Sequence, residues 1–279
     1  MRPKHLYSSK KTRRARDPKN IRKQKKKYPD IAKKIILDSH IILQVLDARY
    51  PDETRNLELE ESIKKQNKKI IYVLNKADLI EKKSKPNFFP YVFVSCVLRK
   101  NIKELRDLIK KESKQIELPD KTKFSKITVG VLGYPNTGKS SLINLLIGRN
   151  SAKTGSDAGF TKGFQKLKLT SEIQLIDSPG VIPEKEYSNI KKQEITKHTK
   201  VGGRSYSQVK EPEMIISKLM EEYPKVFEKF YKIKAENNAE ILLEKLGRKS
   251  NFLKKGNKVN FDQTARLILK DLQRGEIRL

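Results

Sequence analysis

Apolar residues along the chain fall into short continuous runs and into longer segments with helical spacing. Five runs are rich in β-branched residues, which is typical of strands buried on both faces of a parallel sheet. These runs are DSHIILQVLDARYP (38–51), KIIYVLNKADLI (69–80), YVFVSCV (91–97), KITVGVL (126–132) and EIQLIDSPG (172–180). Helical patterns at 101–114 and 141–148 lie between them. The pattern therefore predicts an α/β domain over the first two thirds of the chain.

The last third of the chain has helical spacing only. It predicts helices over 211–233 and 237–247, and a third helix from Asn260, a suitable N-cap residue, to just before Gly275. The third helix has one apolar face, formed by Ala265, Ile268, Leu269 and Leu272. We therefore expect a small all-α domain. Between two of its helices, RKSNFLKKGNK (248–258) is a basic loop, for which RNA contact and a solvated turn are both open interpretations.

The chain carries far more positive than negative charge. Of its 279 residues, 63 are Lys or Arg and 33 are Asp or Glu, which gives a formal net charge of +30. This excess indicates a polyanionic partner, either nucleic acid or an anionic membrane surface. Residues 1–28 hold thirteen Lys or Arg and one acid, Asp17. They predict a basic tail that neutralises phosphates with little sequence preference, although a targeting run or plain solubility would also account for them.

Composition also restricts the cellular location. No apolar run approaches the roughly 20 residues needed to span a bilayer, and the N-terminal segment lacks the apolar region of a secretory signal. A single cysteine, Cys96, excludes an internal disulfide and a CxxC zinc site. We expect a cytoplasmic monomer without membrane insertion.

GYPNTGKS, at residues 133–140, is a phosphate-binding motif between a predicted strand and a predicted helix. Gly133 and Gly138 let backbone N–H groups close around the phosphates. We expect Lys139 to reach the β and γ phosphates and the Ser140 hydroxyl to bind Mg²⁺. The full set of predicted phosphate contacts is Gly133, Asn136, Thr137, Gly138, Lys139, Ser140, Ser141 and Gly180.

Two further motifs follow in the order expected of a nucleotide switch. Thr161, near the end of the glycine-punctuated loop TGSDAGFTKG, could close over Mg²⁺ and the γ-phosphate. Asp177, at the end of the next strand, could hold the Mg²⁺ shell through water, and Gly180 could donate its N–H to the γ-phosphate. Val181 follows where many regulatory GTPases place a glutamine that orients the attacking water. Either hydrolysis is slow in the isolated protein, or another group or a metal ion supplies the activation.

The group that reads the base lies upstream of the phosphate motif. Asn75-Lys76-Ala77-Asp78 ends a predicted strand, and the Asp78 carboxylate can accept hydrogen bonds from N1–H and the 2-amino group of guanine. Adenine offers neither donor, so it would leave a buried carboxylate unpaired. Lys76 can cover the ring with its stem, and Asn75 can tie the loop to its neighbours. Ser95-Cys96, after the next strand, is placed to present a backbone N–H to guanine O6, with Cys96 acting as a small residue.

The order of these motifs indicates a circular permutation. The chain begins in the middle of a Ras-like domain, with the base reader first and the phosphate loop, Mg²⁺ threonine and DxxG motif afterwards. A polar linker at roughly 113–125 would join the old C-terminus to the old N-terminus. The ends of compact domains lie close together, so such a permutation is sterically easy.

This order resembles the circularly permuted GTPases of the YlqF/YawG family, which act in ribosome assembly. The resemblance rests on Asp47-Ala48-Arg49 with Pro51, Arg55 and Asn56, on NKAD, GYPNTGKS, DAGFTKG and DSPG, and on the closing segment FDQTARLILKDLQRGEIRL. It implies a potassium-stimulated GTPase that needs Mg²⁺, with Asn136 as the K⁺ ligand and Asn136, Lys139 and Thr161 in catalytic roles. It also implies rRNA and the large ribosomal subunit as partners. Many bacterial members begin with a W-F-P-G-H-M segment; this chain does not, and His5 is not a match for its histidine.

Three hypotheses for function remain open. The preferred one is a GTP-hydrolysing switch in assembly of the large ribosomal subunit, with a permuted GTPase domain at 29–185 and a linker and helical domain at 186–279. The second is a regulatory GTPase that acts on another RNA or on a membrane. The third is an RNA-binding scaffold whose nucleotide site is only structural, and the intact Lys139, Ser140, Thr161 and Asp177 argue against it.

Overall fold

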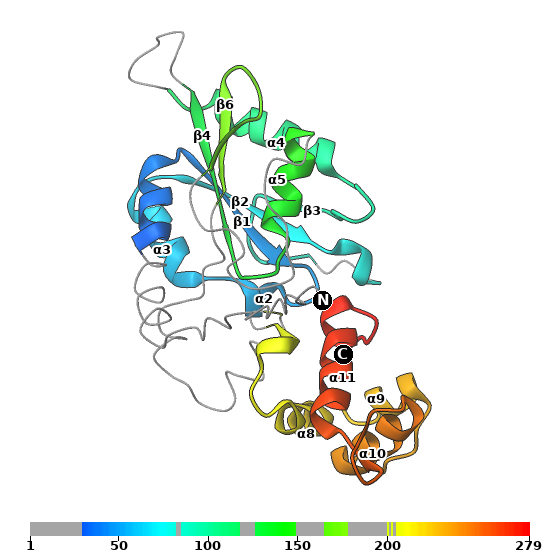
Figure 1. Cartoon of the computed structure of the whole chain (residues 1–279). Coiled ribbons are helices and arrows are strands. Elements are labelled where there is room, and N and C mark those ends of the chain that lie inside the picture. Colours follow the sequence, from blue (N-terminus) through cyan, green and yellow to red (C-terminus); the bar gives the residue numbers. More distant parts are fainter. Residues whose placement is uncertain are drawn as a thin grey trace, which may run out of the picture.

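A mostly parallel sheet forms the centre of the first domain (Figure 1). The computed structural model describes residues 30–81, 85–117, 126–148, 165–177, 200, 202 and 205–279. Within these residues the sheet has six strands in the order β3-β2-β1-β4-β6-β5, and only β5 is antiparallel. The strands are β1 (Ile41–Asp47), β2 (Lys69–Asn75), β3 (Tyr91–Phe93), β4 (Ile127–Gly133), β5 (Gln165–Lys168) and β6 (Ile173–Asp177).

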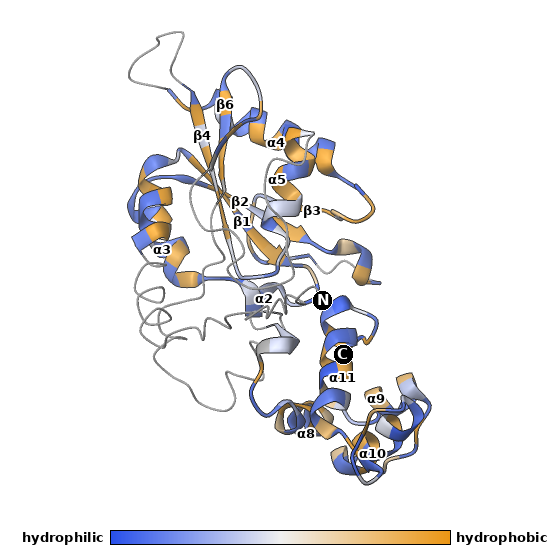
Figure 2. Cartoon of the chain, viewed as in Figure 1, coloured by the Kyte–Doolittle hydropathy of each residue, from blue (hydrophilic) through white to orange (hydrophobic). Residues whose placement is uncertain are grey.

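Helices cover both faces of this sheet, which is why its strands are apolar runs rather than alternating ones. On one face, α4 (Ile102–Lys114) and α5 (Lys139–Ile147) pack against the sheet through residues such as Leu105 and Leu142. On the other face lie a helix over residues 30–38 and α3 (Leu57–Lys65). Figure 2 shows the matching stripes of apolar and polar residues along these helices. The predicted α/β domain is confirmed.

The sheet places the loops of the sequence motifs along one edge. β1, β2, β3, β4 and β6 are parallel, so their carboxyl ends meet at the same side of the sheet. β4 is central, between β1 and β6, although it is fourth in the chain. The short segment α2 (Pro51–Thr54) and the single turn η1 (Ala77–Leu79) follow the carboxyl ends of β1 and β2.

The second domain is a helical bundle with its own apolar core. It contains η2 (Tyr206–Gln208), α8 (Pro212–Glu222), α9 (Val226–Tyr231), α10 (Ala239–Lys249), the hairpin strands β7 (Leu253–Lys254) and β8 (Lys258–Val259), and α11 (Phe261–Arg274). α11 packs against α8 and α10. Its predicted limits are confirmed: the Asn260 side chain accepts from Gln263 N, and Gly275 is the C-cap in a left-handed conformation.

Two predictions for this domain are wrong in detail. The single helix predicted over 211–233 is two helices, because Pro224 has no N–H to continue the hydrogen-bond ladder of α8. The segment 248–258, predicted as a loop, contains the C-terminal end of α10 and the β7–β8 hairpin. Among the residues that the structure describes, no helix combines the length and the apolar character that crossing a membrane requires.

Candidate nucleotide-binding site

The phosphate motif forms the turn between β4 and α5. Three of its residues have positive φ: Gly133 (154°), Asn136 (60°) and Gly138 (93°). A Cβ atom at Gly138 would collide with the Asn75 side-chain amide. Gly138 is thus required both by its backbone conformation and by the close approach of Asn75 from the loop after β2.

Buried polar groups hold this loop in shape. The Lys139 ammonium is nearly buried and donates to the carbonyl oxygens of Gly133 (3.1 Å) and Tyr134 (2.8 Å). The Thr137 hydroxyl, also buried, donates to the Tyr134 carbonyl at 2.9 Å. Ser140 and Ser141 lie in the first turn of α5, whose N-terminus carries partial positive charge. The loop therefore gathers the positive groups suited to polyphosphate at one point.

Asn75 connects the NKAD loop, predicted to read the base, to the phosphate loop. Its Nδ2 donates to the Thr137 carbonyl at 2.7 Å, and its Oδ1 accepts from Cys96 N at 3.2 Å. One buried amide thus joins the ends of β2 and β4 and the segment after β3. The two motifs lie 62 positions apart in sequence and are in direct contact here.

Asp78 lies in the η1 turn after β2, beside the segment that follows β3. Its carboxylate accepts a hydrogen bond from the Ser95 hydroxyl, which in turn accepts from Leu98 N at 3.0 Å. Burial raises the pKa of the Cys96 thiol to about 12, so the thiol stays protonated at neutral pH and is unsuited to act as a nucleophile. Because Cys96 N donates to Asn75, contact with guanine O6 would require that bond to be shared or broken.

A buried ion cluster beneath this loop was not predicted. Asp47, at the end of β1, is fully buried and pairs with Arg49 and with Lys76. Burial raises the pKa of Asp47, but the two cations outweigh it and bring that pKa down to about 2. The sequence signal for this cluster is the Asp47-Ala48-Arg49 motif, which places a carboxylate and a guanidinium at the end of a buried strand.

Other residues of that resemblance have structural roles. Pro51 begins α2, where its missing N–H has no partner to lose. Asn56 caps α3 by accepting from Leu59 N at 3.1 Å, and Arg55 forms an ion pair with the buried Glu60 at 2.7 Å. The motif after Asp47 thus fixes the path of the chain from β1 into α3.

Some of the predicted site residues lie outside the part of the chain that the structure describes, or at its border. Thr161 and Gly180 are outside the described residues. Asp177 is the last residue of β6, next to the strand that leads into the phosphate loop, and its side chain is outside the description. Asn136 is described, and its Nδ2 donates to the Gly202 carbonyl at 2.7 Å.

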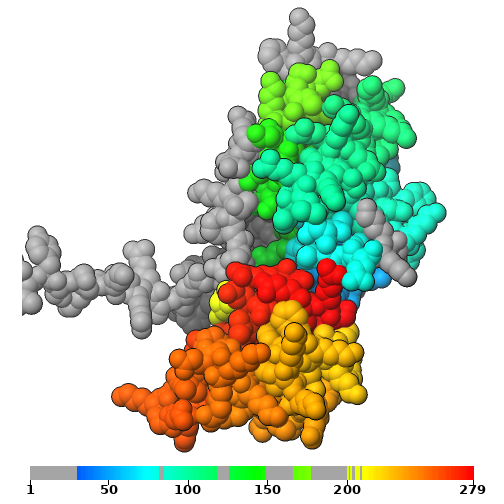
Figure 3. Space-filling model, turned by 90° about the vertical axis from the view of Figure 1, so that its right-hand side faces the viewer, coloured from blue at the N-terminus to red at the C-terminus, as the bar shows by residue number. Residues whose placement is uncertain are grey.

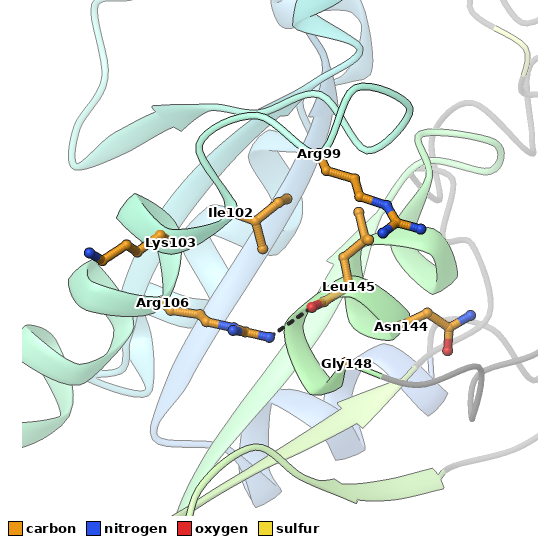
Figure 4. A pocket seen from close by; sticks show the side chains of 7 residues that line it. All are labelled: Arg99, Ile102, Lys103, Arg106, Asn144, Leu145 and Gly148. Atoms are coloured by element: carbon orange, nitrogen blue, oxygen red, sulfur yellow. Dashed lines mark hydrogen bonds between the residues drawn. The ribbon is translucent and has the colours of Figure 1, made fainter.

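A separate basic pocket of about 330 Å³ lies between α4 and the C-terminal end of α5 (Figure 4). It is lined by Arg99, Ile102, Lys103, Arg106, Asn144, Leu145 and Gly148. Arg106 donates to the carbonyls of Leu145 (2.8 Å) and Leu146 (2.5 Å) and so satisfies the last turn of α5. The pocket is at the opposite end of α5 from the phosphate loop and is not part of the nucleotide site.

The sheet order and the contact between the two loops define a P-loop GTPase whose motifs are circularly permuted. A family model described as "50S ribosome-binding GTPase" matches residues 128–245. Two solved structures of YlqF from T. maritima share the fold. The GDP-bound form has a TM-score of 0.59 and 22% sequence identity, and the match covers 88% of this chain and 94% of that chain. The GNP-bound form has a TM-score of 0.58 and 20% sequence identity, and the match covers 91% of this chain and 94% of that chain.

Sequence relatives agree with this class. An uncharacterized GTP-binding protein of Methanocaldococcus jannaschii is 40% identical over 259 residues, which are 90% of this chain and 67% of the relative. Nucleolar GTP-binding protein 2 of Neurospora crassa is 34% identical over 256 residues, which are 88% of this chain and 40% of the relative. This chain belongs to the family of YlqF-like circularly permuted GTPases. It spans less than half the length of the nucleolar relative.

Proposed function

We propose that this GTPase binds GTP at the joined loops, hydrolyses it, and acts as an assembly switch on the large ribosomal subunit through contact with rRNA. The observation that carries the nucleotide assignment is the hydrogen bond from Asn75 Nδ2 to the Thr137 carbonyl. It holds the residues proposed to read guanine and those proposed to hold the phosphates in one rigid unit. A single ligand with both chemical groups, a guanine nucleotide, matches this arrangement.

In the proposed complex, Asp78 accepts from the guanine N1–H and 2-amino groups while Lys76 covers the ring. Ser95 orients the Asp78 carboxylate, as its hydroxyl does in the structure. Backbone N–H groups at 133–140 and the Lys139 ammonium hold the phosphates. Lys139 exchanges the carbonyls of Gly133 and Tyr134 for phosphate oxygens, which are stronger acceptors because they are charged.

The donor set at this edge of the sheet suits Mg²⁺, a hard cation that takes oxygen ligands. Ser140 is in the first turn of α5, and Asp177 ends the strand adjacent to β4. We propose that these two residues and Thr161 hold the ion, which when bound supplies charge neutralisation at the β and γ phosphates. Asn136 is proposed to offer its Oδ1 to K⁺, with its Nδ2 held by the Gly202 carbonyl.

Three observations support the ribosomal part of the proposal. The matching family is described as ribosome-binding, and a fungal relative is named as nucleolar. The net charge of +30 favours association with a polyanion such as rRNA. The β7–β8 hairpin presents the exposed lysines Lys254, Lys255 and Lys258, and Figure 3 shows this part of the chain projecting at the lower left in orange.

Single-turnover GTP hydrolysis tests the proposal. We expect faster turnover in K⁺ than in Na⁺, because Val181 cannot orient water as a glutamine does and a cation must help at the phosphates. We expect further stimulation by large ribosomal subunits. Equal turnover in the two salts would reject the potassium role. Stimulation by another RNA or by vesicles, and not by subunits, would favour the regulatory GTPase, while binding without hydrolysis under any condition would favour the scaffold.

A further inference from the structure

The C-terminal end of α11 is packed directly onto the proposed guanine-reading loop. The Arg49 guanidinium donates from Nη1 to the Leu272 carbonyl at 3.1 Å, between residues 223 positions apart. Arg278 forms an ion pair with Glu81 at 2.6 Å. Gly275 fits against Leu79 so closely that a Cβ atom there would lie 2.5 Å from Leu79 Cδ1. Figure 3 shows this end of the chain, in red, lying against the cyan part of the GTPase domain.

The same arginine also belongs to the ion cluster under the loop. Arg49 donates to both Asp47 carboxylate oxygens, from Nε at 3.0 Å and from Nη2 at 2.8 Å. Lys76 donates to Asp47 Oδ2 at 2.8 Å. The Asp47 side chain is 0% exposed and that of Arg49 is 8% exposed, so the geometry is not that of a loose surface pair. A bidentate guanidinium–carboxylate pair fixes both groups in one plane.

Arg49 therefore adds a buried polar link to the contacts that Gly275 and Arg278 make with the segment after β2. Its Nε and Nη2 hold the carboxylate that positions Lys76, and its Nη1 holds the last turn of α11. The Leu272 carbonyl lies at the negative end of the α11 dipole, where a cation is favoured. It also accepts from Gly275 N at 3.0 Å, so Arg49 contacts the helix cap itself.

We infer that Arg49 is a positioning residue for guanine recognition and that it couples the base-reading loop to docking of the helical domain. This inference rests on the proposed guanine site. When guanine lies under Lys76 and on Asp78, the loop is held in the conformation that accepts Gly275 and Arg278. Coupling between two sites is reciprocal, so docking of α11 must strengthen guanine binding by the same factor.

The test measures the affinity of the full chain for GDP and for inorganic tripolyphosphate, which has phosphates and no base. We expect Arg49→Met to weaken GDP binding by about 5-fold or more and to leave tripolyphosphate binding unchanged. GDP should protect the backbone amides of residues 77–81 and 272–279 from hydrogen exchange in the wild type, and the protection at 272–279 should disappear in the variant. Arg248→Met is the matched control, because that arginine is half exposed and pairs with Glu244 within α10.

A second pair of variants approaches the contact from α11 and leaves the buried Asp47 pair intact. Gly275→Ala places a methyl group against Leu79 and should reproduce the loss of GDP affinity. Leu79→Ala in the same chain makes room and should restore part of it. The inference is wrong if Arg49→Met and Gly275→Ala bind GDP as the wild type does, or if they lose GDP and tripolyphosphate alike. Failure of the wild type itself to bind GDP would instead overturn the proposed guanine site, and the coupling with it.

Discussion

At the scale of single residues, the proposed site depends on a few side chains whose partners are fixed by the fold. Asn75 has both ends of its amide occupied, and Gly138 must lack a side chain to let Asn75 approach. Asp78 is held by Ser95 on one side and can face the base with its other oxygen. A change at Asp78 should therefore affect nucleotide binding more than the fold, whereas a change at Asn75 or Gly138 should disturb both.

Asp78→Asn should weaken GTP binding and shift preference toward xanthosine triphosphate. The amide replaces one acceptor with a donor, which clashes with the guanine N1–H and 2-amino group and suits the oxygen of xanthine. Loss of a charged hydrogen bond predicts at least about 2 kcal/mol of lost binding free energy, roughly 30-fold in affinity. Calorimetric titration with the two nucleotides measures it, with Asp107→Asn on the exposed side of α4 as the control. Unchanged GTP affinity would remove Asp78 from the base-reading role.

Motif residues could be predicted from the sequence because local chemistry restricts them. The glycines, the lysine and the carboxylate of the loops are needed at those spacings whatever the rest of the chain does. The partners of these residues could not be predicted in the same way. Arg49 reaches a carbonyl 223 positions away, and a backbone carbonyl has no signature in the sequence. The full burial of Asp47 likewise depends on how β1, η1 and α11 meet, which no single segment shows.

At the scale of elements, the five parallel strands and α11 were predicted, whereas the break between α8 and α9 and the β7–β8 hairpin were not. The amphipathic stripe and the Asn260 cap gave the limits of α11. The β7–β8 hairpin has two residues in each strand, too few to show alternation. It is stabilised by packing: a Cβ at Gly247 would overlap the Val259 side chain, and Phe252 N donates to the Gly247 carbonyl at 2.8 Å. Such a contact depends on α10 being in place already.

The β7–β8 hairpin pairs two lysines across its strands, which lowers the stability of the folded domain. Lys254 and Lys258 are direct cross-strand partners, and like charges in such a pair repel. Within the described residues neither one forms an ion pair, although Lys254 interacts electrostatically with the Asp262 carboxylate and so lowers the pKa of Asp262. An RNA phosphate beside the pair would relieve the repulsion, and this is the basis for expecting RNA contact here.

Lys254→Glu should therefore have opposite effects on stability and on RNA binding. The new Glu–Lys pair should stabilise the domain by about 0.2–1 kcal/mol, measured as a shift in the denaturant midpoint. RNA affinity should fall, and the slope of log affinity against log salt should become shallower by about one phosphate contact or more. Lys229→Glu on the exposed surface of α9 is the control and should leave both nearly unchanged. If the hairpin is only a solvated turn, stability will rise and RNA binding will not change.

At the scale of the whole molecule, the two domains meet at two places on the same edge of the sheet. One is the contact of the C-terminal end of α11 with Arg49 and with the segment after the proposed base-reading loop. The other is near the phosphate loop, where Asn136 contacts Gly202 and Lys200 contacts the Tyr223 hydroxyl at 2.7 Å and Glu53 at 3.4 Å. The nucleotide would thus lie between two connections to the helical domain, one at each of its ends. The permutation is consistent with this, because β6 is the last described strand of the sheet in chain order and the helical domain follows it in the sequence.

The state of the nucleotide should therefore set how the helical domain is held. Loops that contact a γ-phosphate are ordered in the GTP form and released after hydrolysis. The Asn136–Gly202 contact places Gly202 beside the phosphate loop, where it can respond to the nucleotide. If both domains contact rRNA, the GTP form presents them in one fixed arrangement and the GDP form does not. We predict that a non-hydrolysable GTP analogue strengthens binding to the large ribosomal subunit relative to GDP, by a factor between about 5 and 150.

Lys200→Met tests whether the effect of the nucleotide on subunit binding depends on the contacts of Lys200 with Tyr223 and Glu53. Lys200 packs over the Tyr50 ring at 4.8 Å and the Tyr223 ring at 5.1 Å, so it bridges the GTPase domain and α8–α9. Its loss should bring the subunit affinities of the two nucleotide states closer together while leaving affinity for the nucleotide alone nearly unchanged. Lys210→Met, an exposed position before α8, is the control. A second measurement follows because coupling between two binding sites is reciprocal. The factor by which subunits raise the affinity for the GTP analogue must equal the factor by which the analogue raises the affinity for subunits. Equal subunit affinities of the wild type in the two states would show that nucleotide does not control docking, whatever the variant does.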